Sequence, residues 1–249
     1  FNRGGETTAS LNITPDGSIN LMLGNPDVAG SRGSIAMMAA EELGVPFEKV
    51  RPIIGDTSAL GYNHSTVGSR VTFSAGMAIV RAARNAIKVL CQRAAVTWDV
   101  PEDSVIFEDG YVRPASTNVG DFEPLSIADI AKNAGKTGGA IAGHAEINAT
   151  GAGPGFGVHL CDVDVDRETG LVKILRYTVV EDAGKAINPK QVEGQFQGGA
   201  VQGIGWALNE EYIYTKEGHM DNTGFLDYRI PVASDMPMID TQIIEVPNP

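Results

Sequence analysis

The stretch VGSRVTF at residues 67–73 leads into a long run of small and apolar residues with helical spacing, which continues to Trp98. The start of such a helix leaves backbone N–H groups unpaired at the positive end of its dipole, which favours an anion. Gly68 allows a ligand close to the backbone, Ser69 can donate or cap, and Arg70 carries a planar fork that pairs with phosphate oxygens. The alternative is a capped helix with Arg70 in solvent.

A second glycine-rich stretch, GQFQGGAVQGIG at 194–205, leads into a helix expected over about 190–210. Each glycine inside a helix costs up to about 1 kcal/mol relative to alanine, so close packing or a ligand must offset several of them. The amides of Gln195 and Gln197 donate and accept, which suits the edge of a heterocycle or a metal-oxo group. We predict that both stretches contact an anionic organic cofactor, with plain helix packing as the structural alternative.

The flanking patterns predict an α+β fold. Alternating residues around Asp16 and Gly17 predict a β-hairpin, and a short amphipathic helix ends at Gly44. Further along, the patterns predict a buried strand (VRPIIGDT), a hairpin turning at Asp109 and Gly110, a helix capped by Ser126, and a hairpin around RETG (167–170).

Residues 135–157 are glycine-rich and nearly featureless, so we place a boundary there, between subdomains 1–145 and 146–249. The order of hairpin, glycine-bearing loop and helix recurs on both sides of it. We therefore predict two related α+β subdomains, each with antiparallel strands and a glycine-rich loop leading into a long helix. The chain closes on IDTQIIEVPNP without a terminal helix. We expect a fragment or one piece of a split polypeptide, with the second subdomain incomplete.

Composition excludes several classes of function. The net charge of −12 leaves no basic surface for nucleic acid or anionic lipid, and no apolar run approaches the roughly 20 residues of a membrane span. Cys91 and Cys161 are expected to be buried thiols in a reducing, cytoplasmic setting. No Cys-x-x-Cys pair or histidine cluster occurs, so iron–sulfur and metal sites are not expected within the chain.

Other polar and aromatic residues receive ordinary structural interpretations. Asp162, Asp164 and Asp166 alternate along a strand, which places them on one solvated face. His64 is expected to be structural or exposed, and Trp206 to lie in the core.

The segment GQFQGGAVQGIGWALNEE closely resembles the signature of the molybdopterin-binding subunit of the xanthine dehydrogenase and aldehyde oxidase family, a Gly-Gln-x-x-Gly-x-x-x-Gln-Gly-x-Gly run. Three more segments fit in order, and the resemblance covers most of the chain, as the C-terminal half of that subunit. These segments are AAEELGVPFEKVRPIIGDT, STVGSRVTFSAGMAIVRAA and VEDAGKAINPKQVEGQ.

The resemblance implies cofactor contacts at three places. Gly68, Ser69, Arg70 and Thr72 would contact the pterin and its phosphate, and Gln195 the pterin or the region of the metal ligands. A third loop has Val28, Ala29 and Gly30 where the family commonly has Gly-Gln-Gly, and its Ala29, Gly30 and Ser31 would contact the cofactor. The usual glutamine is missing there, and Ser31 and Arg32 could replace part of its contact.

The resemblance also implies a function. Members of this family hydroxylate an aldehyde or an N-heterocycle with water-derived oxygen. They use molybdopterin, with its cytosine dinucleotide form as an open alternative, and molybdenum. The remainder of the molybdopterin subunit would be a partner, as would an iron–sulfur subunit and an FAD subunit. The family's general base, a glutamate, would lie beyond Pro249, so we expect no catalytic residue or metal ligand in this chain and no activity from it alone. The alternatives are a non-catalytic molybdopterin carrier and an unrelated nucleotide-binding enzyme.

Overall fold

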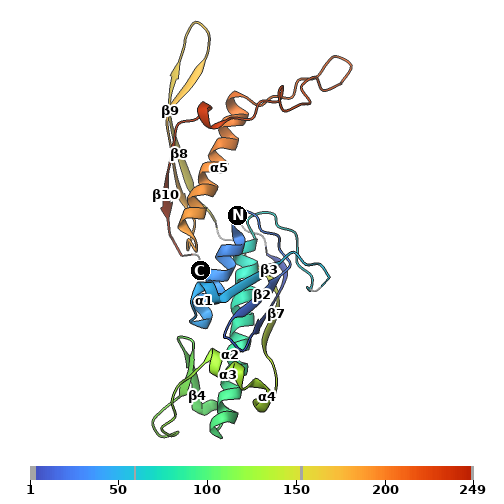
Figure 1. Ribbon diagram of the computed structural model, residues 1–249. Coiled ribbons are helices and arrows are strands. Elements are labelled where there is room, and N and C mark those ends of the chain that lie inside the picture. The colour runs from blue at the N-terminus through green and yellow to red at the C-terminus, as the bar shows by residue number, and fades with distance from the viewer. Residues whose placement is uncertain (1–3, 59, 152–153, 248–249) are drawn as a thin grey trace. The chain divides into compact units, whose positions relative to one another are not determined.

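The computed structural model describes residues 4–58, 60–151 and 154–247, and the chain divides into two compact units, residues 1–153 and 154–249 (Figure 1). Both units combine helices with β-sheets, so the predicted α+β class is confirmed. Residues 248 and 249 of the closing Pro-Asn-Pro lie outside the described residues. The two units are described separately below.

A four-stranded sheet forms the centre of the first unit, in the order β3-β2-β1-β7. β1 is antiparallel to β2 and to β7, whereas β3 is parallel to β2. The predicted first hairpin is confirmed: Gly17 adopts φ 78°, and the Asp16 carboxylate accepts from the Ser18 backbone N–H at 3.0 Å. The strands span Gly5–Ile13 (β1), Ile19–Leu23 (β2), Val50–Ile54 (β3) and Ile141–Ala149 (β7).

The strand β3 was predicted to be buried, and this is wrong. It lies at the edge of the sheet, and alternate residues face solvent, with Ile53 45% exposed. The apolar run VRPII resembles a central strand because an edge strand next to a crossover helix still packs one face against the core.

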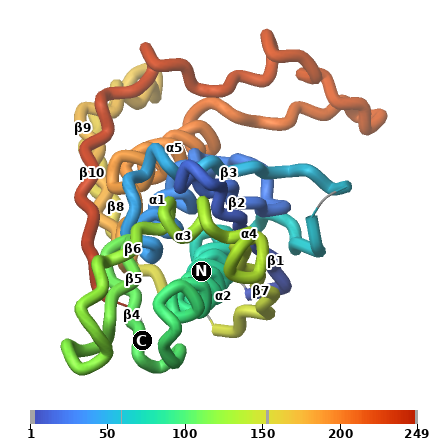
Figure 2. The backbone as a smooth tube through the Cα atoms, turned by 60° about the horizontal axis from the view of Figure 1, so that its bottom comes forward, coloured from blue at the N-terminus to red at the C-terminus, as the bar shows by residue number. Residues whose placement is uncertain are grey.

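Helices α1 (Ser31–Leu43) and α2 (Gly76–Trp98) pack against each other and against the strands of this sheet (Figures 1 and 2). One turn of π-helix, η2 (Val71–Ala75), precedes α2. Gly44 ends α1 in the left-handed conformation, as predicted, with φ 58°. Small residues dominate the helix contact, and a Cβ at Gly76 would lie 2.7 Å from the sulfur of Met38. The two helices can therefore lie close together.

The segment 135–157 is not featureless, because it contains β7. Its residues alternate between buried and exposed positions over nine residues, and β7 pairs with the whole length of β1. Its inward residues are small where α2 approaches: a Cβ at Gly143 would lie 2.0 Å from the carbonyl oxygen of Ala82. The predicted boundary between residues 145 and 146 falls inside this strand, and the chain divides after Gly153 instead.

The rest of the first unit is a small three-stranded sheet with two short helices. The predicted hairpin is confirmed, with Asp109 at φ 46° and Gly110 at φ 80°. The cap at Ser126 is also confirmed, because its hydroxyl accepts from the Asp129 N–H at 3.1 Å while the Asp129 carboxylate accepts from the Ser126 N–H. The elements are η1 (Phe47–Lys49), η3 (Glu102–Ser104), β4 (Val105–Glu108), β5 (Tyr111–Pro114), β6 (Leu125–Ser126), α3 (Ile127–Lys132) and α4 (Ala134–Thr137).

The second unit has a three-stranded sheet in the order β10-β9-β8 with one long helix, α5 (Pro189–Leu208), packed on it. β8 is antiparallel to β9, and β10 is parallel to β9. Its small core consists of Val179, Ala200, Ile204 and Ile239. The other elements are β8 (Gly157–Val165), β9 (Val172–Asp182), η4 (Ala233–Asp235) and β10 (Ile239–Ile244).

Two predictions of burial fail. Trp206 is 80% exposed on α5 instead of lying in the core, because the helix face that carries it does not pack on the sheet. Cys161 is exposed on β8 and Cys91 is only half-buried on α2, although both cysteines are free thiols. The three aspartates that follow in β8 and its turn are exposed, as predicted, and Asp162 pairs with Arg176 at 2.8 Å.

The two units repeat one topology, as predicted. Two antiparallel strands, a helix and a strand parallel to the second strand occur as β1-β2-α1-β3 and again as β8-β9-α5-β10. The first unit adds α2 and β7 to this repeat.

Candidate functional site

In each unit a helix begins at the carboxyl ends of the parallel pair of strands. α1 joins β2 to the parallel β3, and the loop after β3 leads to η2 and α2, so the loops at 24–30 and 55–70 lie at the same edge of the sheet. The loop at 183–188 and the start of α5 hold the corresponding place in the second unit. Ligands of open α/β sheets commonly bind at such an edge.

Asn25 ties together the two loops of the first unit. Its side chain is buried, and its amide donates to the carbonyl oxygen of His64 at 3.3 Å and to the Thr66 hydroxyl at 3.5 Å. A Cβ at Gly24 would lie 2.5 Å from the Asn63 amide nitrogen, so a larger residue there would displace the Asn63 side chain. The sequence analysis missed Asn25, because a lone asparagine in a loop gives no sign of a partner 39 residues away.

Arg70 is fully buried, in contrast to the predicted phosphate contact. Its guanidinium donates to the carbonyl oxygens of Gly4, Gly5, Glu6 and His64 at 2.8–3.2 Å and to the Thr7 hydroxyl at 2.5 Å. Burial lowers the pKa of Arg70 from its ordinary value, yet the group stays charged near neutrality. Its donors are directed into the protein, where they join the start of β1 to the loop before α2.

Gly68 and Ser69, which directly precede Arg70, are exposed to solvent. Both residues adopt the left-handed conformation, with φ 59° and φ 56°. Within the described part of the chain, neither backbone N–H has a hydrogen-bond partner. Thr72, one turn later on η2, is exposed as well. The turn therefore presents two free donors just before a helix, and Arg70 supports it from inside.

The third predicted loop differs from this turn because its donors are already used. Ser31 donates its N–H to Val28 at 3.1 Å, and Arg32 donates its N–H to the Asp27 carboxylate at 3.0 Å. Ala29 and Gly30 both adopt positive φ, and Gly30 caps α1 without a side-chain hydrogen bond. A carboxylate thus lies at the start of α1, so this loop offers the Ser31 hydroxyl rather than an anion cradle.

In the second unit, the stretch at 194–205 lies inside α5 rather than in a turn before it. The two candidate glutamines have different environments: Gln197 donates to the Ile239 carbonyl oxygen at 3.1 Å, which holds α5 on β10. Gln195 is exposed and makes no side-chain hydrogen bond to the residues that the structure describes. A Cβ at Gly194, Gly198 or Gly199 would meet nothing within 4 Å. The surface of α5 beside Gln195 is therefore open at these three glycines.

The chain shows no other chemical centre among its described residues. No three histidine, cysteine, aspartate or glutamate side chains there lie close enough to hold a metal ion. His64 is exposed, and its Nδ1 lies within hydrogen-bond distance of the hydroxyl and carbonyl oxygens of Ser65. A helix with the length and apolarity of a membrane span is likewise absent from the described residues. The candidate site is thus a binding surface rather than a catalytic constellation.

Comparison with known proteins identifies the ligand class. The family model for the molybdopterin cofactor-binding domain matches residues 1–237, which include all three predicted contact regions. This chain belongs to the molybdopterin cofactor-binding domain family. The molybdopterin-binding domain is 34% identical over 258 residues to the nicotine 6-hydroxylase large subunit of Paenarthrobacter nicotinovorans. It is 32% identical over 249 residues to the carbon monoxide dehydrogenase large chain of Hydrogenophaga pseudoflava.

The fold agrees with that assignment. The structure of quinoline 2-oxidoreductase from Pseudomonas putida 86 superposes with a TM-score of 0.86 at 28% identity, covering 98% of this chain and 32% of that one. The two sequence relatives are covered over 30% of their lengths, and each match includes 97% of this chain. The molybdopterin-binding domain therefore spans about a third of the length of its relatives.

Proposed function

We propose that this domain is the molybdopterin-binding portion of a molybdenum hydroxylase, which inserts water-derived oxygen into a C–H bond of an aldehyde or N-heterocycle. The observation that carries the proposal is the open glycine face of α5 beside the unpaired Gln195, in a chain that belongs to the molybdopterin cofactor-binding family. Two relatives with N-heterocycles in their names, nicotine and quinoline, support the substrate class.

The described residues fit the cofactor chemically. The two free N–H groups of Gly68 and Ser69 suit a phosphate oxygen, and the Thr72 hydroxyl lies one turn away. The Gln195 amide can both donate to and accept from the edge of a pterin. Arg70 fixes the Gly68–Ser69 turn before any ligand arrives, so little ordering cost is left for binding. When bound, the molybdenum centre supplies the oxidation chemistry.

We further propose that the cofactor is the cytosine dinucleotide or the simple form of molybdopterin, and that iron–sulfur and FAD subunits accept the electrons. Relatives named as a large subunit and a large chain support a multi-subunit enzyme. Two free cysteines support a reducing, cytoplasmic location. The candidate residues among those that the structure describes are binding groups, so we expect no turnover of aldehydes or purines by the 249-residue chain alone.

Substitution of the contact residues in the intact enzyme tests the proposal. Gln195→Ala should lower the molybdenum content, whereas Gln242→Ala, at an exposed glutamine on β10, should leave it unchanged. Gly68→Val should also lower the content. Gly218→Val is the matched control, because that glycine has φ 83° with open space around it. Metal analysis and mass spectrometry of the released pterin give the readout.

The outcomes separate the possibilities. Unchanged molybdenum stoichiometry in both contact variants would refute the contact assignments. A fully loaded enzyme without turnover would favour the alternative, a non-catalytic carrier of molybdopterin. Release of a simple nucleotide instead of a pterin would refute both.

A further inference from the structure

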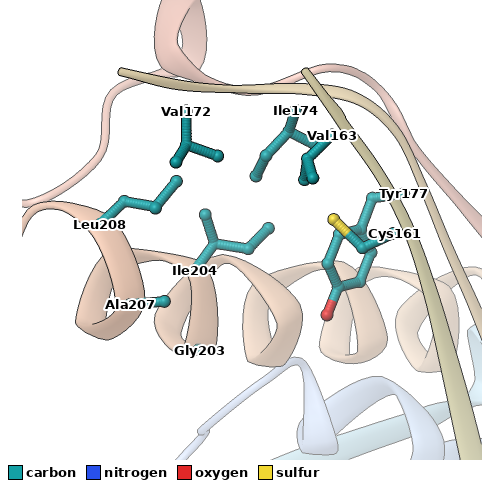
Figure 3. Close-up of a pocket in the computed structure, with 9 residues that line it drawn as sticks. All are labelled: Cys161, Val163, Val172, Ile174, Tyr177, Gly203, Ile204, Ala207 and Leu208. Carbon is teal, nitrogen blue, oxygen red and sulfur yellow. The ribbon is translucent and has the colours of Figure 1, made fainter. Parts of the chain in front are cut away.

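An apolar hollow lies in the second unit between α5 and the strands β8 and β9 (Figure 3). Its volume is about 230 Å³. In Figure 3 the side chain of Ile204 points up from α5 toward Ile174 and Val163, which come down from the strands, and a gap remains between the two sets. Cys161 and Tyr177 border one end and Val172 and Leu208 the other. An apolar space of this kind at the side of a helix lacks a packing partner.

The first unit shows what fills the equivalent place in the repeat. There, α2 packs beside α1 and over β1 and β7, so the strand that corresponds to β8 is covered by a second helix. The middle of α2 is fully buried in this contact, at Ile79, Ala82, Ala83 and Ala86. In the second unit, α5 packs on β9 and β10, and no second helix covers β8 within the described residues.

The two units also differ in how the outer edge of the first strand of the repeat is paired. β1 pairs with β7 along nine residues on the side away from β2. β8 pairs only with β9 among the strands that the structure describes, and every residue of β8 is exposed. Val163 is 49% and Val165 47% exposed on the same face of β8 as Cys161, which is unusual for an apolar strand. The strand thus has an open backbone edge as well as an open apolar face.

The face of α5 toward the hollow is shaped for close helix packing. Gly203 and Ala207 lie one turn apart and both line the hollow. A Cβ at Gly203 meets nothing within 4 Å, although glycine weakens the helix. The matching contact in the first unit also uses a glycine, Gly76 of α2 against Met38 of α1. No described residue therefore lies close enough to require a glycine at position 203. A helix packed against α5 from outside the described residues would require one.

We propose that an α-helix with a small, apolar face packs into this hollow alongside α5, and that an antiparallel β-strand pairs with the free edge of β8. Both would come from further polypeptide linked to this domain, which in its relatives is accompanied by about twice its own length. The internal repeat indicates what kind of helix and strand these are, because in the first unit α2 covers β1 and β7 pairs with its outer edge. The proposal concerns packing and does not depend on the cofactor.

The thiol of Cys161 provides a direct probe, because it borders the hollow and is exposed. N-ethylmaleimide should label Cys161 readily in the 249-residue chain and at least about tenfold more slowly in the longer polypeptide, where the helix covers it. Cys91 is the internal reference, since it lies on α2 in both forms and burial raises its pKa. Hydrogen exchange of residues 157–165 should slow in parallel. Equal labelling and exchange in both forms would overturn the proposal.

A substitution at Gly203 adds a second readout. Gly203→Leu should be tolerated or stabilising in the 249-residue chain, because the space is open, but should lower the melting temperature of the longer polypeptide and restore labelling of Cys161. Gly135→Leu, on the exposed helix α4 with equally open space, is the control and should behave alike in both forms. If Cys161 is already protected in the 249-residue chain and native mass spectrometry shows a dimer, a second copy covers the face and the proposal is wrong.

Discussion

Replacement of Arg70 distinguishes an internal clamp from a phosphate ligand. The guanidinium is fully buried and donates five hydrogen bonds, four of them to backbone carbonyls. A buried acceptor left without a partner costs about 1–3 kcal/mol. Removal of the guanidinium leaves several acceptors without this donor at once, so we expect Arg70→Met to lower the free energy of unfolding by about 3–5 kcal/mol.

A lysine at position 70 keeps the positive charge but lacks the planar guanidinium with its three separate nitrogen atoms. Its single ammonium has three donors on one atom and cannot reach all four carbonyls, so Arg70→Lys should still cost about 2 kcal/mol. The matched control is Arg84→Met on α2. Arg84 is exposed and pairs with Glu42 at 2.6 Å, so its loss should cost at most about 1 kcal/mol.

Urea unfolding followed by circular dichroism measures these differences. In thermal unfolding of a chain of this size, 1 kcal/mol corresponds to roughly 2–4 °C, so Arg70→Met should lower the melting temperature by about 10 °C. The result that refutes the reasoning is specific. If Arg70→Lys leaves stability within about 0.5 kcal/mol while the intact enzyme loses molybdopterin, then Arg70 contacts the cofactor rather than the backbone.

Three further substitutions test other parts of the fold. Gly143→Val should cost more than about 3 kcal/mol in urea unfolding, since its Cβ would lie 2.0 Å from the Ala82 carbonyl oxygen; a neutral effect would contradict the close approach of α2 to β7. Gly198→Ala should stabilise the 249-residue chain by up to about 1 kcal/mol, because the space around that glycine is open. Ser126→Ala should cost about 1 kcal/mol at pH 7 through loss of the cap. The Ser126 hydroxyl also donates to the Asp129 carboxylate and lowers the pKa of Asp129, so the part of the cost due to this hydrogen bond is present above the ordinary carboxyl pKa of about 3.9 and is lost as the pH falls through the lower pKa of the folded state; a cost that grows at acid pH would contradict this.

Features decided by local chemistry could be predicted from the sequence. Gly17, Gly44 and Gly110 adopt the left-handed conformation that their turns and cap require, and Ser126 caps its helix with the neighbouring Asp129. Each involves residues fewer than five positions apart. The helix at 76–98 was also predictable, since its apolar spacing is sustained over six turns.

Features decided by distant contacts could not be predicted. Arg70 has five acceptors, and four of them lie more than 60 residues away at the start of β1. From the sequence alone, an arginine that follows Gly-Ser at the start of a helix is predicted to bind an anion. The structure shows that the donors of Arg70 already bind backbone carbonyl oxygens and the Thr7 hydroxyl. β7 was missed for a related reason, since close packing against α2 selects alanine and glycine, which have low strand propensity.

The repeat explains why one glycine-rich signature serves two purposes along α5. The start of the helix lies at the carboxyl ends of a parallel pair, so Gln195 and its neighbouring glycines occupy the position at which ligands bind in such folds. Two turns later, Gly203 borders the hollow on β8, where α2 stands in the first unit. Substitutions at the two ends should therefore separate cleanly. Changes at Gln195 should alter cofactor content without altering stability, whereas changes at Gly203 should alter the stability of the longer polypeptide first.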